Sequence, residues 1–72
     1  MKIKVKTTSG TTIIETDKIC AITETLDGGG LLTAPDYVLD IHMENGTIFT
    51  TKVQEEARVV IYHSWGADIA LD

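Results

Sequence analysis

The stretch YVLDIHMENGTIFTTKVQEEARVVIYHSW, residues 37–65, decides the fold, because its hydrophobic period changes along its length. Residues 37–43 alternate between two faces, which is typical of a strand with one face on a core. Asn45-Gly46 follows, and this pair strongly favours a tight type I′ turn, since both residues tolerate a positive φ. Residues 47–53 then form the returning strand. The first half of the stretch is therefore a predicted β-hairpin.

The second half of the stretch has the period of a helix. Its apolar and small residues recur at i, i+4, i+7, i+8 and i+11: Val53, Ala57, Val60, Ile61 and Ser64. Thr51 with Gln54 fits a capping box at the start, with acidic residues in the first turn. Gly66 is a typical helix stop. We therefore expect one C-terminal helix that begins near Thr51.

Three further strands precede this hairpin. Residues 2–7 alternate between lysines and apolar or threonine side chains, and residues 11–15 are rich in β-branched residues. Residues 19–26 form a third strand, followed by a loop over residues 27–36, DGGGLLTAPD. The order predicts an α+β fold: a small antiparallel β-sheet of hairpins with one C-terminal α-helix. The residues expected in its core are Ile3, Val5, Ile14, Ile22, Leu39, Ile41, Ala57, Val60 and Ile61.

Length and composition bound the class of protein. With 72 residues, 43% hydrophobic and 24% charged, the chain (residues 1–72) is expected to be a single small folded domain. No apolar run approaches the ~20 residues of a membrane-spanning helix. TTSGTT follows the basic start MKIKVK where a signal peptide would be apolar, and the lone Cys20 has no disulfide partner within the chain. We therefore expect a cytoplasmic protein that is not inserted in a membrane.

The charge distribution disfavours nucleic acids and anionic membranes as partners. Eleven acidic residues stand against six basic ones, for a net charge of −5. Three of the six, Lys2, Lys4 and Lys6, share one face of the first strand, where they are expected to be a solvated edge that opposes aggregation. Phosphate neutralisation by Lys and Arg supplies most non-specific nucleic-acid affinity, and the rest of the chain has only Lys18, Lys52 and Arg58 against eleven acidic residues.

The glycine triplet and the polar strand face were considered as sites. Gly28, Gly29 and Gly30 do not match a phosphate-binding loop, because no GK[ST] and no helix start follow them. A flexible hairpin loop that could contact a partner is the better interpretation. Asp40 and His42 share a strand face, so the carboxylate could orient the imidazole, although a polar outer face of the sheet is the better interpretation.

No catalytic or metal-binding pattern emerges. Asp40 and His42 lack a serine in a strained nucleophile turn, so no triad is predicted. Cys20, His42 and His63 match no compact ligand spacing, and Cys20 is expected to be a small buried side chain. We therefore expect no cofactor, no metal and no enzymatic activity.

The end of the helix is the candidate for contacts with other chains. Tyr62, His63 and Trp65 gather there, and aromatic residues are enriched at protein–protein contacts. Contact with another chain and capping of the core are both open for Trp65. The tail ADIALD carries Ile69 and Leu71, which a purely solvated tail does not need. Since a core of this size is marginal, we expect a homo-oligomer in which this tail adds to a neighbour's sheet edge.

The chain resembles one family over residues 2–63. TSGTTIIETDKICAITET and VLDIHMENGTIFTTKVQEEARVVIYHSW are similar to the small flagellar-motility proteins called FlbD or SwrD. The matching positions are Gly10, Asp17, Ile19, Ile22, Glu24, Ile41, Asn45, Gly46, Val53, Glu55, Glu56 and Ile61. The longer loop DGGGLLTAPD and the tail ADIALD depart from the family pattern. The resemblance implies a non-enzymatic accessory protein, and a small phage or mobile-element protein could carry the same fold.

Two classes of function follow from these observations. The first is an accessory or regulatory protein that binds another protein. The second is an oligomeric protein that binds or sequesters a small molecule in pockets between subunits, since one short chain encloses little space.

Overall fold

The computed structural model describes residues 1–67, so Ile69 and Leu71 lie outside the described residues. The elements in chain order are β1 (Lys2–Thr7), β2 (Gly10–Glu15), η1 (Thr16–Lys18), β3 (Ile19–Asp27), β4 (Asp36–Met43), β5 (Ile48–Val53) and α1 (Glu55–Trp65). The α+β class with one C-terminal helix is confirmed. No helix within residues 1–67 is long and apolar enough to cross a membrane.

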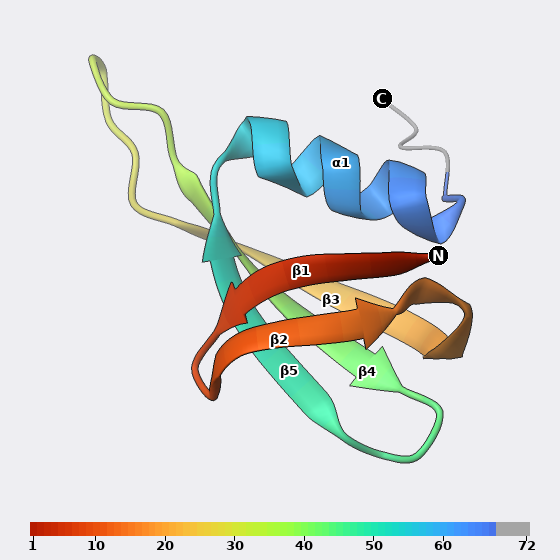
Figure 1. The fold of residues 1–72 in the computed structure, drawn as a ribbon. Helices are drawn as coiled ribbons and strands as arrows, with labels where there is room; N and C mark the ends of the chain where they lie inside the picture. Colours follow the sequence, from red (N-terminus) through yellow and green to blue (C-terminus); the bar gives the residue numbers. More distant parts are fainter. Residues whose placement is uncertain (68–72) are drawn as a thin grey trace.

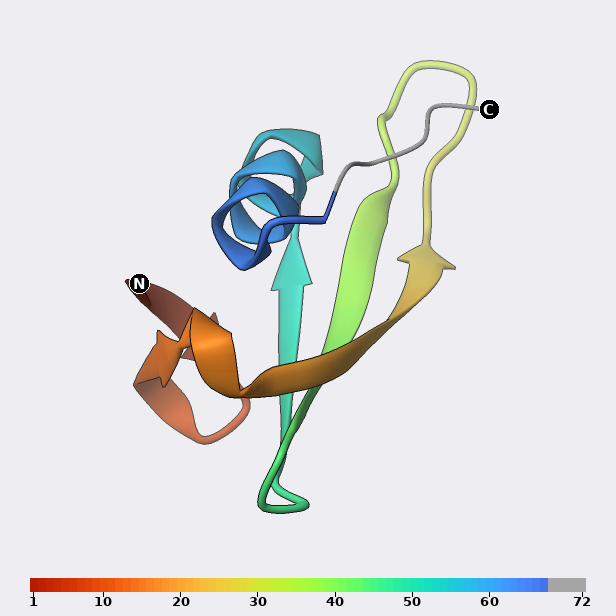
Figure 2. The ribbon, with the colours of Figure 1, turned by 90° about the vertical axis from the view of Figure 1, so that its right-hand side faces the viewer.

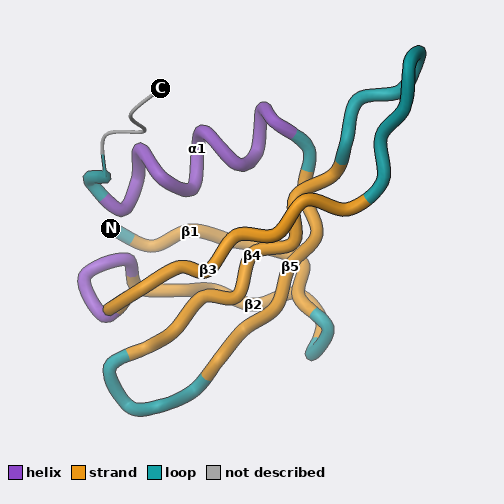
Figure 3. The backbone as a smooth tube through the Cα atoms, turned by 180° about the vertical axis from the view of Figure 1, so that it is seen from behind, coloured by secondary structure: helices purple, strands orange, loops and turns teal. Residues whose placement is uncertain are grey.

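The strands divide between two antiparallel sheets, β1-β2 and β3-β4-β5 (Figure 3). Cross-strand pairs such as Ile3 with Ile14 and Ile22 with Ile41 set the registers. The helix α1 and the β1-β2 hairpin lie on the same side of the three-stranded sheet, with the helix above the hairpin (Figure 2). The hairpins alternate apolar and polar faces, as antiparallel strands with one buried face do.

The core gathers between α1 and the two sheets. Its buried apolar residues are Val5, Ile14, Ile19, Leu39, Ile41 and Ile61. Five of these six were predicted, and the predicted Ile3 and Ile22 pack at the margin of the core. Ala57 and Val60 were wrongly placed in the core, because both are exposed and Val60 keeps 61% of its surface in contact with solvent. The helix instead turns Ile61, Tyr62 and Trp65 toward the strands.

The start of the helix also differs from the prediction. Thr51 does not cap α1, because β5 continues through it to Val53 and the N-cap residue is Gln54, without a side-chain capping bond. The Thr51 hydroxyl instead donates to the backbone carbonyl of Lys6 on β1. A contact distant in sequence has replaced the local cap. The stop at Gly66 is confirmed, with φ of 89° in the left-handed region.

A β-bulge changes the faces of β3. The register of β3 with β4 shifts between Ile19 and Ala21, and one extra residue at such a position reverses which side chains face inward. Ile19 and Ile22 consequently both reach the core, although strict alternation puts them on opposite faces. The prediction that Cys20 is buried is wrong, because its side chain is exposed.

Candidate interaction site on the hairpin arm

The β3-β4 hairpin extends past the rest of the molecule (upper left in Figure 1). We call residues 24–39 the arm: the end of β3, the connecting loop and the start of β4. Its strands are paired from Glu24 with Leu39 to Asp27 with Asp36. Leu39 is fully buried, so the arm grows directly out of the core.

The tip of the arm presents leucines to water. Leu31 and Leu32 are 104% and 99% exposed, and Leu26 on the adjoining strand is 63% exposed. Fully burying one leucine side chain is worth about 1.5–3 kcal/mol, and the isolated chain gains none of this at the tip. An apolar tip on a projecting hairpin is a typical feature of a surface that contacts another molecule.

The loop that carries the leucines follows a defined path. Gly28 and Gly29 have φ of 78° and 93°, a region that favours glycine. A Cβ added at Gly29 would lie 3.0 Å from the Cβ of Pro35, so a side chain at that position would be crowded as well as strained. The Gly30 N–H donates to the Thr33 carbonyl at 2.9 Å, which closes the tip. The glycine triplet thus turns the chain and exposes the two leucines after it.

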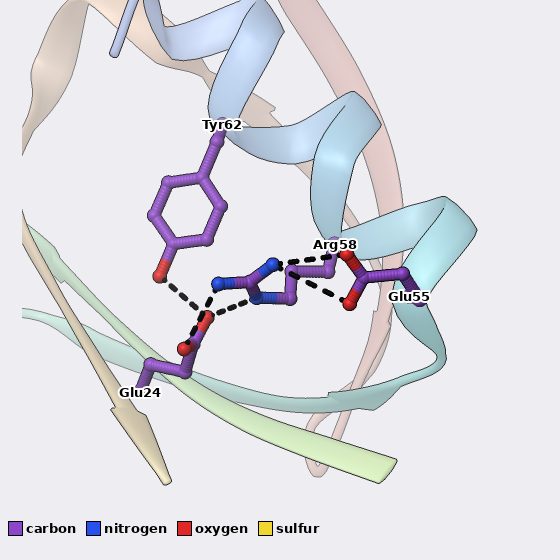
Figure 4. A network of polar contacts seen from close by, with 4 residues as sticks. All are labelled: Glu24, Glu55, Arg58 and Tyr62. Carbon is purple, nitrogen blue, oxygen red and sulfur yellow. Dashed lines mark hydrogen bonds and ion pairs between the residues drawn. The ribbon is translucent and has the colours of Figure 1, made fainter. Parts of the chain in front are cut away.

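The base of the arm is joined to α1 by a polar cluster (Figure 4). Arg58 of the helix forms a two-point ion pair with Glu24 through Nε and Nη2, the latter 3.1 Å from Oε2. The Tyr62 hydroxyl donates to the same carboxylate at 3.0 Å. Arg58 also bonds Glu55 at 3.2 Å, one turn back along the helix, and its guanidinium stacks 4.5 Å from the centre of the Tyr37 ring on β4. Four side chains from three elements thus converge on one arginine.

The pKa shifts in this cluster follow from its ion pair and its hydrogen bonds. The bond from Arg58 lowers the pKa of Glu24 from its usual 4.5, and the bond to Glu24 raises the pKa of Arg58. Burial, assisted by the bond to Glu24, raises the pKa of Tyr62 to about 12. Glu24 and Arg58 therefore stay charged and Tyr62 stays neutral over the whole physiological range. The cluster therefore joins the arm to α1 through a charged ion pair that a neutral phenol also contacts.

A second ion cluster lies farther along the arm. Lys52 of β5 is 2.8 Å from the Asp27 carboxylate and 3.8 Å from that of Asp36. Without the lysine, the two aspartates would repel each other, because they stand opposite in the β3-β4 register. Lys52 thus holds both strands of the arm together just before the glycine loop.

Of the predicted contact residues at the helix end, Tyr62 and Trp65 face inward, His63 does not, and Ile69 and Leu71 lie outside the described residues. The Trp65 indole N–H donates to the Ile19 carbonyl at 3.2 Å, and its ring is 6.5 Å from that of Tyr62. Both rings pack against the core. Of the two alternatives for Trp65, these contacts support capping of the core. His63 is exposed.

Asp40 and His42, which were considered as a catalytic pair, bond different partners. Asp40 accepts a hydrogen bond from Thr50 at 2.7 Å, while His42 pairs through Nε2 with Thr23 at 3.1 Å. Each therefore interacts with a threonine of a neighbouring strand. Across residues 1–67, no three His, Cys, Asp or Glu side chains gather as ligands for a metal ion.

Sequence reasoning missed the contact of Arg58 with Glu24 and the exposed leucines at the tip of the arm. Helical spacing relates Arg58 to Glu55 and Tyr62, but nothing local relates it to Glu24, 34 residues away. The tip did carry a signal, because Leu31 and Leu32 directly follow the glycine triplet in a loop that cannot bury them.

Comparison of the chain with protein-family models, with curated proteins and with solved structures found no match. The resemblance to the FlbD or SwrD proteins therefore stays a prediction.

Proposed function

We propose that this protein is a non-enzymatic accessory protein that binds another protein through the arm and that works as a homo-oligomer. The observation that supports the proposal most is the pair of fully exposed leucines at the tip of the arm. The ion pair of Arg58 with Glu24 explains how the leucines are presented, since it holds the base of the arm against the helix. The FlbD or SwrD resemblance suggests the same class of accessory protein.

A rigid base and an apolar tip suit insertion into a hydrophobic pocket of a partner. Fixing the base of the arm before binding reduces the conformational entropy that binding would otherwise remove. The two leucines then act as anchor side chains, because burying both is worth several kcal/mol. Asp27 and Asp36, already neutralised in part by Lys52, flank the tip without opposing its burial.

The experiment compares the Leu31→Ser/Leu32→Ser variant with wild type and with an Ile13→Ser/Ile48→Ser control. Ile13 and Ile48 are 66% and 55% exposed but lie away from the arm, so the control removes two exposed apolar side chains elsewhere. A protein captured by wild type and by the control is identified, purified and titrated calorimetrically against all three chains. We expect the arm variant to lose at least about a hundredfold in affinity, the equivalent of about 2.7 kcal/mol.

Two results would contradict the proposal. Equal affinity of the arm variant and the control would remove the arm from the interface. Native mass spectrometry that finds a stoichiometric small molecule and no protein partner would instead favour the sequestering class.

A further inference from the structure

A groove separates β1 from β5 below the helix. The two strands are joined at one end, where the Thr8 N–H donates to the Thr50 carbonyl at 3.0 Å and the Thr51 hydroxyl donates to Lys6. Beyond that point, β1 and β5 belong to separate sheets and are not paired as a ladder. The space between them and α1 is a groove of ≈ 410 Å³.

The backbone of β1 along the groove faces the gap. Thr8 and Lys6 both direct backbone groups toward β5. Alternate residues of a strand direct their N–H and C=O groups to the same side, so Lys4 does the same. Lys4 lies in the wall of the groove. It faces the end of β5, whose edge toward β1 is not paired with another strand.

The backbone of β5 faces the gap from the other side. The Thr50 carbonyl accepts its bond from β1, so the N–H and C=O of Lys52, two residues on, also point away from β4. Lys4 consequently offers a donor and an acceptor to a strand that lies along β1 in the groove, whereas Lys52 adjoins Thr51, whose hydroxyl bridges β5 to Lys6. Strand addition at such an edge gains main-chain hydrogen bonds without a deep pocket.

The side chains of the groove specify what kind of strand fits. Its inner wall is apolar and comes from Val5, Val53, Ala57, Val60 and Ile61. Its outer rim carries Lys4 and Lys6 on β1, Glu56 on α1, and Lys52 on β5, whose ammonium group already pairs with Asp27 and Asp36. A fitting strand therefore alternates apolar residues, which face the helix, with acidic residues, which lie beside Lys4 and Lys6.

We propose that the C-terminal segment of a second copy of this chain, residues 67–72, adds as this strand between β1 and β5. The segment reads Ala67-Asp68-Ile69-Ala70-Leu71-Asp72, with Asp68–Asp72 outside the described residues. Its odd-numbered residues are apolar and match the inner wall, which includes the exposed Val60. Its even-numbered residues place Asp68 and Asp72 on the lysine side. The inference deepens the homo-oligomer of the proposed function.

The end of α1 favours a second copy over the chain's own tail. The Gly66 and Ala67 N–H groups both donate to the Tyr62 carbonyl, at 3.0 and 3.1 Å, so the chain leaves the helix on the Tyr62 side. Tyr62 faces β3, where its hydroxyl bonds Glu24. Val60 lines the groove and lies two residues before Tyr62, which places it about 200° away around the helix axis. Reciprocal exchange of tails between two copies closes a two-fold dimer.

The test exchanges charges between the groove and the tail in the full-length chain. One variant carries Lys4→Glu/Lys6→Glu, the other carries Asp68→Lys/Asp72→Lys, and Lys18→Glu is the control, because Lys18 lies outside the groove. In sedimentation velocity we expect wild type and control to be dimers and each charge variant alone to weaken the dimer by about tenfold or more. An equimolar mixture of the two variants should form a heterodimer, since both of its tail–groove contacts again join opposite charges. Amide NMR shifts of Lys4 and Lys52 should move when it forms.

Each other outcome overturns the inference in a recognisable way. A monomeric wild type refutes both tail exchange and the homo-oligomer of the proposed function. Dimers that persist in both charge variants refute tail exchange and leave self-association by another surface. A mixture that stays monomeric, with groove amides moved by the tail substitutions in the monomer, shows that the tail binds its own chain.

Discussion

Arg58 is the residue that ties the helix to the arm. Its side chain is only 13% exposed, although arginine is usually solvated, because Glu24, Glu55 and the Tyr37 ring surround it. An arginine suits this position better than a lysine, since its planar guanidinium bonds a carboxylate at two points while it stacks on an aromatic ring. The stability of this contact therefore depends on the charge of Glu24.

The Glu24→Gln variant tests that dependence through pH. Because the pKa of Glu24 is lowered in the folded state, its stabilisation is fully present above the unfolded value of about 4.5 and is lost as pH falls through the folded value. We expect the variant to unfold about 1–2 kcal/mol more easily at neutral pH and to lose less stability than wild type on acidification below pH 4.5. Urea unfolding between neutral and acid pH measures both effects.

Glu56→Gln is the matched control, because Glu56 is exposed one position after Glu55 in the first turn of α1. The control should follow the wild-type acid profile closely. A Glu24→Gln profile that parallels wild type at every pH would show that the ion pair contributes nothing to folding.

At the scale of elements, the arm depends on the geometry of its glycines. Gly29 combines a φ of 93° with a close approach to Pro35, while Gly30 has neither a positive φ nor an atom near its missing Cβ. Two neighbouring glycines in one loop therefore have different physical roles. The first permits the turn, and the second is replaceable.

Alanine substitutions separate these roles. Gly29→Ala should lower stability by about 1–2 kcal/mol, because it combines left-handed strain with the contact at Pro35. Gly30→Ala should leave stability unchanged or raise it by about 0.4–1 kcal/mol, since alanine reduces the entropy of the unfolded chain. Thermal unfolding of both variants checks the difference. Equal effects at the two positions would contradict the loop path described here.

At the scale of the whole molecule, two sheets and one helix share a single core. Ile14 of β2 is 1% exposed and belongs to the same buried cluster as Leu39 and Ile41 of β4. The β1-β2 hairpin is hydrogen-bonded to the larger sheet only at one end of the groove, so apolar burial must hold the rest of it in place. The fold should therefore unfold as one unit.

A pair of neighbouring substitutions tests this shared core. Ile14→Ala removes buried atoms and should cost about 2–5 kcal/mol, whereas Ile13→Ala changes a side chain that is 66% exposed and should cost under about 1 kcal/mol. Hydrogen exchange should then show the amides of β4 losing protection together with those of β2. Loss of protection confined to β1 and β2 would mean that the hairpin unfolds separately.

The sequence by itself determined the features that depend on neighbours along the chain. Alternation placed the strands, Asn45-Gly46 placed a hairpin turn, and Gly66 placed the end of the helix, because turns and caps depend on the φ that a few adjacent residues can adopt. The predicted type I′ geometry of the turn is wrong, because Gly46 has a positive φ of 90° and Asn45 does not. The same alternation correctly selected Val5 and Ile41 as buried. Even the apolar tip of the arm was readable, as leucines after a loop glycine.

Only the tertiary structure decided which faces meet. The aliphatic positions Ala57 and Val60 were expected to face the core, but the buried stripe of α1 is Arg58, Ile61, Tyr62 and Trp65, at i, i+3, i+4 and i+7. Hydrophobic period identifies residues that share a face, whereas the face that packs is set by the partner surface. Here Glu24 and Tyr37 of the arm complement an arginine and a tyrosine better than a small alanine. The bulge at Cys20 and the bond of Thr51 to Lys6 have the same origin, because each satisfies a contact with a strand that is distant in sequence.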